Sequence, residues 1–182
     1  DTTEKVVRLI EECRHLQITV APPDVNHCAF RFSVADDRTI RYGLGALKGL
    51  GEAVIEAMVG QRGSAGPYLD LADLCKRNAE HKLNRRALEA LIKAGALDSL
   101  GDSRPMLMAA LDGVLQITEQ HVKAKASGQS DFFGLETSAG TTEDADVLDL
   151  SALADVRPWS KEEILAGEKE TLGLYLSGHP ID

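Results

Sequence analysis

Two adjacent phenylalanines stand in a segment whose surroundings predict a loop. The segment runs Gln129-Ser130-Asp131-Phe132-Phe133, after a long helical pattern and before an acidic stretch. Exposed phenylalanine lowers solubility, so a folded domain usually buries such rings within a periodic element. The pattern favours a short linear peptide that inserts into an apolar pocket of another protein, with the glutamine fixing the register through hydrogen bonds. The alternative is that both rings fold back and close the core of their own domain.

A second motif has the pattern apolar-x-Gly-apolar-Gly and is followed by an amphipathic helical pattern. It consists of Leu47, Lys48, Gly49, Leu50 and Gly51. This is the hairpin spacing of a helix-hairpin-helix motif, in which Leu50 would anchor the hairpin in the core. Glycine at 49 and 51 permits positive φ and leaves no Cβ between the backbone and an approaching phosphate.

The backbone amides from Gly49 to Ala53 are expected at a helix N-terminus, where unpaired N–H groups and the helix dipole favour an anion. Lys48 could add a charge-assisted contact. Such a site grips one DNA phosphate without reading bases. The alternative is a tight turn that only packs, because Gly-x-Gly before a helix also serves that purpose.

Six basic residues interrupt an otherwise acidic sequence: Lys76, Arg77, His81, Lys82, Arg85 and Arg86. Three of them, Lys82, Arg85 and Arg86, are candidates for a patch along a DNA backbone. A solvated helix end and loop is the alternative interpretation.

The remaining composition excludes several function classes. The net charge of −9 argues against an extended DNA-binding surface, although a local basic patch can still be present. No carboxylate pair and no Ser/His/Asp or Cys/His set has catalytic spacing, so we predict no catalytic residue and no metal site. Cys13, Cys28 and Cys75 are widely spaced and are expected to be small apolar residues in a reducing compartment. No apolar run reaches membrane-spanning length.

The first 44 residues predict a small α+β element. Residues 4–16 have helical periodicity, residues 18–20 are typical of a short strand, and two alternating segments flank an Asp36-Asp37 turn, which indicates a β-hairpin. Residues 45–127 then predict a helical domain. Its helices are expected over 53–59, over 68–77, from an Asn84 N-cap, and from a Ser103 N-cap to about Ala126.

The rest of the chain predicts a peptide over 128–134, an acidic linker over 135–159 and a helix within 160–182. Residues 134–156 contain six carboxylates and no lysine or arginine, which is typical of a mobile linker. Ser160 and Glu163 form a capping-box pattern, and the helix that follows is expected to include Leu174 and Tyr175. The predicted fold class is α+β, mostly α.

The order of six phrases resembles the alpha subunit of bacterial replicative DNA polymerase III, of polymerase family C. The phrases are EKVVRLIEECRHL, APPDVN, IRYGLGALKGLGEAVIEAM, KLNRRALEALIKAGALDSLG, GQSDFFG and GEKETLGLYLSGHP. The resemblance spans essentially the whole chain. It implies the end of the fingers, the clamp-binding domain that carries the helix-hairpin-helix, and the linker towards the oligonucleotide-binding fold.

In that family a pentapeptide of the form Q-x-D-[LMF]-F binds the sliding clamp, the beta subunit. The resemblance implies that Gln129 makes polar contacts at the pocket edge while Phe132 and Phe133 enter the apolar cleft. Phe132 stands where the family most often has Leu or Met. The resemblance also places Gly49, Leu50 and Gly51 against a phosphate of the duplex that leaves the polymerase.

The family is a DNA-directed DNA polymerase that uses Mg²⁺ held by aspartates of the palm. No aspartate of this chain matches that motif, so the resemblance implies a non-catalytic part of an enzyme with no cofactor of its own. The implied partners are the sliding clamp, double-stranded DNA and other holoenzyme subunits, in the bacterial cytoplasm and without a membrane.

Two functions from other classes stay open at this point. One is a helix-hairpin-helix repair enzyme such as a glycosylase, for which Asp70 and Lys76 are weak catalytic candidates. The other is a protein–protein adaptor whose hairpin no longer binds DNA.

Overall fold

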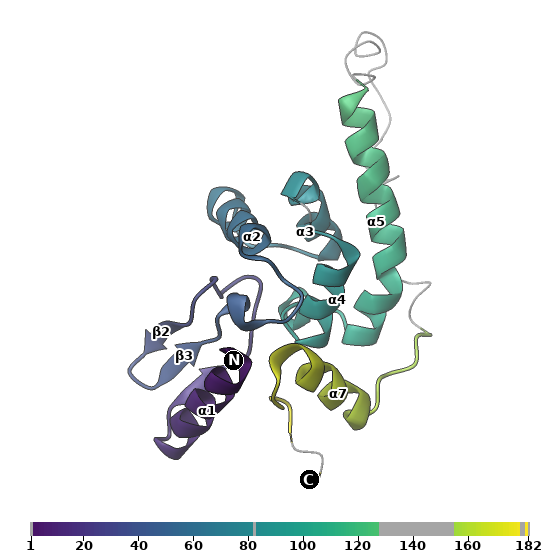
Figure 1. Ribbon diagram of the computed structural model, residues 1–182. Coiled ribbons are helices and arrows are strands. Elements are labelled where there is room, and N and C mark those ends of the chain that lie inside the picture. Colours follow the sequence, from purple (N-terminus) through teal and green to yellow (C-terminus); the bar gives the residue numbers. More distant parts are fainter. Residues whose placement is uncertain (1, 82, 128–154, 179–180, 182) are drawn as a thin grey trace.

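The computed structural model describes residues 2–81, 83–127, 155–178 and 181. The predicted clamp-binding peptide, Lys82 and most of the acidic segment lie outside this part of the chain. The described residues form a mostly helical structure with a small sheet at one end, which confirms the predicted fold class (Figure 1).

A helix and a three-stranded sheet form the N-terminal element. They are α1 (Thr2–His15), β1 (Thr19–Ala21), β2 (Ser33–Asp36) and β3 (Thr39–Arg41). The strand order is β1-β3-β2, with β1 parallel and β2 antiparallel to β3. The predicted β-hairpin around Asp36 and Asp37 is therefore confirmed, with a register shift between Val34 and Asp36.

Four α-helices and three 3₁₀ turns follow the sheet. They are η1 (Leu44–Ala46), α2 (Glu52–Ala65), α3 (Leu71–Arg77), η2 (Ala79–His81), α4 (Arg85–Lys93), η3 (Asp98–Leu100) and α5 (Arg104–Ala126). The predicted N-caps are confirmed, since Asn84 accepts a hydrogen bond from the Ala87 amide at 2.9 Å and Ser103 accepts one from the Met106 amide. Such caps satisfy amides that the helix itself leaves unpaired.

The helix predicted over residues 68–77 begins later, at Leu71. Asp70 is its N-cap and accepts a hydrogen bond from the Asp73 amide at 2.7 Å. Tyr68 instead lies in the preceding turn, where its hydroxyl donates to the Met58 carbonyl at 2.7 Å. The cap and this long-range hydrogen bond together set the start of α3.

The last helix, α7 (Lys161–Leu172), has the predicted capping box. The Glu163 amide donates to the Ser160 hydroxyl at 3.2 Å, and the Ser160 amide donates to the Glu163 carboxylate at 2.7 Å. The helix ends at Leu172 because Gly173 adopts a φ of 79°, in the left-handed region. The expectation that Leu174 and Tyr175 belong to this helix was therefore wrong.

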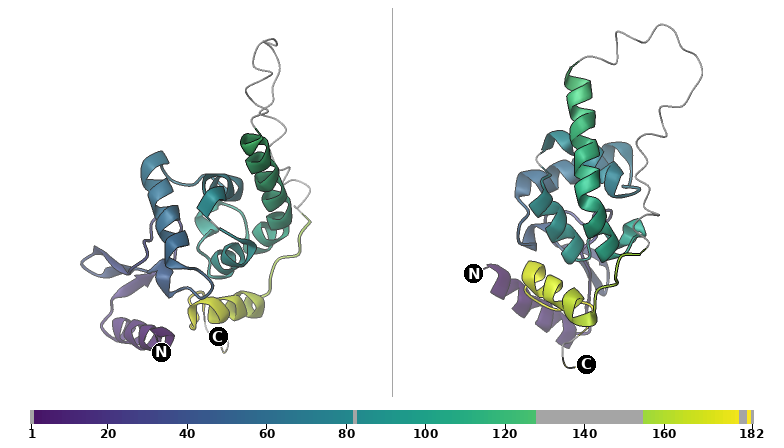
Figure 2. Two further views of the ribbon diagram at one scale, coloured as in Figure 1. Left: turned by 45° about the horizontal axis from the view of Figure 1, so that its top comes forward. Right: turned by 90° about the vertical axis from the view of Figure 1, so that its right-hand side faces the viewer.

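One cluster of buried apolar side chains joins the N-terminal element, the central helices and α7. It includes Ile10 of α1, Leu88 and Leu91 of α4, Leu111 of α5 and Leu172 of α7. Figure 2 shows α7 beside α1 and below α4, while the C-terminal part of α5 projects beyond the other helices. The division of the chain into separate segments at residues 44, 127 and 160 stays a prediction.

Two of the three cysteines are buried as expected, Cys28 and Cys75, while Cys13 is half-buried. All three are free thiols, and burial raises the pKa of Cys75 to about 12. None of the helices that the structure describes combines the length and apolar character needed to cross a membrane.

Candidate nucleic-acid interface

The hairpin residues 47–51 connect η1 to α2 and are anchored on both sides. Leu47 is only 3% exposed, and Leu50 packs half-buried against the core, as predicted. The Lys48 amide donates a hydrogen bond to the carbonyl of Thr171 at 2.9 Å, at the end of α7. A helix distant in the sequence therefore supports the loop.

The arm that enters the hairpin is a 3₁₀ turn and not an α-helix. Upstream hydrogen bonds hold this segment, since the Leu44 amide donates to the Ala29 carbonyl and the Gly45 amide to the Phe30 carbonyl. The chain is also pressed against its neighbour, because a Cβ on Gly43 would lie 2.7 Å from the Phe32 amide nitrogen. These contacts leave room for only one short turn before the hairpin.

The two glycines of the hairpin differ in conformation. Gly49 has a φ of 97°, which an L-residue rarely adopts, so glycine is needed there. Gly51 is the N-cap of α2 with an ordinary φ of −87°, and a Cβ built on it would have no neighbour within 4 Å. Gly51 therefore does not use the positive φ that glycine permits, but the space in front of its Cα is open.

The first turn of α2 presents backbone donors to this open space. Within the described part of the chain, the amides of Glu52, Ala53 and Val54 have no hydrogen-bond acceptor, because the helical pattern begins with the Ile55 amide bonded to the Gly51 carbonyl. Gly49, Gly51 and Ala53 are all exposed. The helix dipole adds positive potential here, so the geometry suits an anion.

A pocket of about 270 Å³ lies beside the hairpin, which we call the hairpin pocket. It is lined by Lys48, Gly49, Arg86, Glu89, Ala90, Lys93, Glu170 and Thr171. Lys93 is paired with Glu170, at 3.1 Å between Nζ and Oε2. Lys48 and Arg86 form no ion pair with any described residue, so their charges face the pocket without a counter-ion.

The predicted patch of Lys82, Arg85 and Arg86 contributes one residue to this pocket, Arg86. The Arg85 guanidinium hydrogen-bonds Glu89 at 2.8 Å and also pairs with Asp112. These carboxylates raise the pKa of Arg85 and offset its charge. Lys82 lies outside the described residues.

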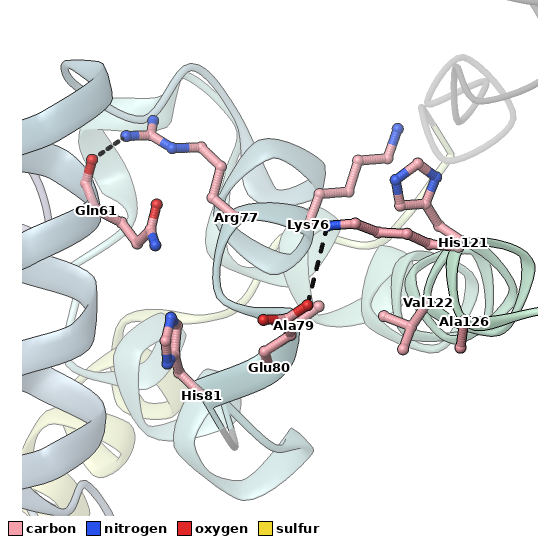
Figure 3. Close-up of a pocket in the computed structure, with 10 residues that line it drawn as sticks. Gln61, Lys76, Arg77, Ala79, Glu80, His81, His121, Val122 and Ala126 are labelled. Atoms are coloured by element: carbon pink, nitrogen blue, oxygen red, sulfur yellow. Dashed lines mark hydrogen bonds and ion pairs between the residues drawn. The ribbon is translucent and has the colours of Figure 1, made fainter. Parts of the chain in front are cut away.

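The other basic residues of the sequence cluster line a separate pocket of about 550 Å³ between α2, η2 and α5 (Figure 3). Lys76, Arg77, His81 and His121 are among its lining residues. Arg77 has a structural role there: it donates to the carbonyls of Gln61 and Gly66 at 2.6 and 2.8 Å. The cluster that looked continuous in the sequence is therefore divided between two pockets.

Lys93 and Glu170 line the hairpin pocket, but no sequence pattern predicted them as site residues. Lys93 is the last residue of α4, and Glu170 belongs to a helix 77 residues further on, so no local pattern joins them. Asp70, the weak catalytic candidate, caps α3. Among the described residues there is no group of three His, Cys, Asp or Glu side chains that could hold a metal ion.

Substituting the two hairpin glycines by alanine should separate stability from phosphate access. Gly49→Ala should lower the free energy of unfolding by about 1–2 kcal/mol, because its φ is left-handed. Gly51→Ala should cost less, about 0.5–1 kcal/mol, because alanine is a poorer N-cap than glycine, and its methyl group would occupy the open space before the α2 amides. Urea denaturation measures both. Equal stabilities would contradict this account of Gly49.

Residues 17–107 match the family of the helix-hairpin-helix motif. This chain belongs to the helix-hairpin-helix family. The match begins before β1 and ends in the first turn of α5, so it covers the hairpin and the wall of the hairpin pocket that α4 supplies.

The full sequence is also similar to proteins named DNA polymerase III subunit alpha. It is 46% identical over 182 residues to that of Escherichia coli (strain K12), 46% to that of Vibrio cholerae, and 47% to that of Xylella fastidiosa (strain Temecula1). Each alignment covers 100% of this chain and 15% of the relative. The predicted resemblance is therefore confirmed, and the chain spans about 15% of the length of these relatives.

Proposed function

We propose that this chain is a DNA-gripping and clamp-tethering region of a bacterial replicative DNA polymerase. The observations that carry the proposal are the open amides at the start of α2 and the two cations without counter-ions, Lys48 and Arg86, that line the hairpin pocket. A phosphate placed there would accept hydrogen bonds from the backbone and face two cations without counter-ions. The 46% identity to DNA polymerase III subunit alpha supports the proposal.

The contact positions duplex DNA without selecting its sequence. Backbone amides and lysine or arginine side chains recognise the phosphate, which is the same at every base pair. A polymerase needs this property because it must hold whatever sequence it has just copied. The net charge of −9 disfavours DNA binding over the rest of the surface, so the phosphate contact would be confined to the hairpin pocket.

The tether is the peptide Gln129 to Phe133, proposed from sequence alone because it lies outside the described residues. The arrangement of α5 supports this role. This helix of 23 residues is about 35 Å long at 1.5 Å per residue, and its C-terminal part projects beyond the other helices (Figure 1). A clamp-binding peptide after its end would leave the hairpin pocket free for DNA.

The wider setting is part of the same proposal. The parent protein would be a DNA-directed DNA polymerase of the bacterial cytoplasm, with Mg²⁺ in a palm outside this chain and with other holoenzyme subunits as partners. This chain would supply no catalytic residue. Its role would be processivity, because a phosphate grip and a ring-shaped clamp both keep the polymerase on its template.

Duplex binding measured at two salt concentrations tests the grip. The wild-type chain should bind a short duplex at low salt and weaken steeply as salt rises. Changing Lys48 and Arg86 together to alanine should weaken binding roughly ten- to thirtyfold, since exposed charge contacts contribute up to about 1 kcal/mol each. The slope of log K against log salt should fall by about 1 per residue.

The matched control changes Lys5 and Arg8 to alanine. Both residues are exposed on α1, away from the hairpin pocket. Their substitution removes two positive charges, as the Lys48 and Arg86 variant does. The control should keep nearly full affinity. Binding that is insensitive to salt, or equal losses in the two double variants, would contradict a phosphate contact at the hairpin.

A further inference from the structure

Helix α7 forms one wall of the hairpin pocket, although a long segment separates it from the hairpin in the sequence. Its Thr171 carbonyl accepts the Lys48 amide hydrogen bond at 2.9 Å. Gly167 allows a close approach to α4, because a Cβ there would lie 3.3 Å from the Cβ of Lys93. Arg104 at the start of α5 also holds α7 in place by pairing with Glu168 at 3.2 Å. The position of α7 against the hairpin is therefore well determined.

This packing places a carboxylate in the pocket that is proposed to receive a phosphate. Both oxygens of Glu170 accept hydrogen bonds from Lys93 Nζ, at 3.1 and 3.2 Å. Lys93, Lys48 and Arg86 line the same pocket. One of its three cations is thus already paired with a group of the same charge sign as a phosphate.

We propose that Glu170 acts as a built-in competitor of the DNA phosphate and sets the strength of the hairpin's grip. This inference rests on the proposed function. Glu170 withholds Lys93 from the DNA until a phosphate displaces it. The side chain of Glu170 is 64% exposed, and exposed ion pairs contribute little free energy, so displacement is easy. The carboxylate therefore tunes affinity and does not block the site.

Such tuning suits a polymerase that must move. A grip that is too strong would hold the duplex at one register, whereas each translocation step requires every phosphate contact to break and form again. With Glu170 present, Lys93 regains a partner whenever the phosphate leaves. Lys93, at the half-buried end of α4, is then never left without a charged partner. This lowers the free-energy cost of releasing the phosphate.

Neutralising Glu170 should tighten duplex binding. In the full chain, Glu170→Gln should bind a short duplex about two- to fivefold more tightly at low salt, the range expected for an exposed pair. The slope of log K against log salt should stay near the wild-type value, because Lys93 contacts the phosphate in both complexes. Fluorescence anisotropy with a labelled duplex measures both quantities.

The matched control is Glu119→Gln on α5. Glu119 is 67% exposed and pairs with Lys123 at 2.8 Å, so its substitution removes the same charge and also frees a lysine, but outside the hairpin pocket. It should leave affinity and salt slope near wild type. An equal gain in the two variants would overturn the proposal, since only the net charge would then matter.

A second background tests whether Lys93 is the group released. Lys93→Met keeps the aliphatic stem that packs on Gly167, and in this background Glu170→Gln should give no gain. A gain that persists, or no gain in the wild-type background, would overturn the inference. Absence of salt-dependent binding by the wild-type chain would instead contradict the proposed function itself, so the two failures are distinguishable.

Discussion

Binding to a bacterial sliding clamp should fall by about a hundredfold or more when Gln129, Phe132 and Phe133 are changed together to alanine. Burying a phenylalanine ring contributes roughly 2–3 kcal/mol before the cost of ordering the peptide. The triple variant removes both rings and the amide that fixes the register. We expect micromolar binding by the wild-type chain and no measurable binding by the variant.

Surface plasmon resonance on an immobilised clamp measures this difference, with Ser130→Ala as the control at the variable position of the motif. The control should bind like the wild type. Equal binding by the triple variant would place the clamp contact elsewhere in the chain. If neither protein binds and the triple variant also melts at a lower temperature, the two rings belong to the core, which is the alternative that the sequence leaves open.

The second large effect concerns stability, and it should come from one buried carboxylate. Glu168 is 0% exposed and accepts hydrogen bonds from the amides of Leu176 and Ser177, at 2.7 and 3.0 Å, and from the Ser177 hydroxyl. It also pairs with Arg104 at the start of α5. Glu168→Ala should lower the free energy of unfolding by about 3–5 kcal/mol, because it leaves these buried donors without an acceptor.

A matched change two residues along the same helix gives the comparison. Glu170 is exposed, and Glu170→Ala should cost less than about 1 kcal/mol. Chemical denaturation of both variants and the wild type measures the difference. Similar free energies of unfolding for the two variants would show that the Glu168 contacts do not stabilise the fold.

The same carboxylate should make stability depend on pH. Burial acts to raise the pKa of Glu168, but hydrogen bonds from Ser177 and Leu176 and the Arg104 pair outweigh it and hold the pKa below the ordinary 4.5. The folded state therefore binds this proton less readily than the unfolded state. Its stabilisation is complete above the unfolded pKa and is lost as pH falls through the lower folded pKa, and Glu168→Ala should flatten that loss.

Local patterns were sufficient to predict most of the elements. Asn84, Ser103 and the Ser160–Glu163 capping box each act within three residues, so their helices begin where the sequence indicates. The hairpin was also readable, because its glycines and buried leucines are adjacent in the chain. The sequence prediction was wrong where a distant contact prevailed, as at Tyr68, whose amide donates to the Asn26 side-chain oxygen 42 residues away and which lies before the start of α3.

By itself, the sequence determined the helix-hairpin-helix family, the fold class and the residues of the hairpin, since these follow from spacing over a few turns. Only the tertiary structure decided which cations face the hairpin pocket. Arg85 is offset by Asp112, Arg77 is held by backbone carbonyls, and Lys93 meets Glu170 from a helix 77 residues away. The physical reason is that the strength with which a charged side chain attracts a ligand depends on its nearest counter-ions. Packing brings those counter-ions from any part of the chain.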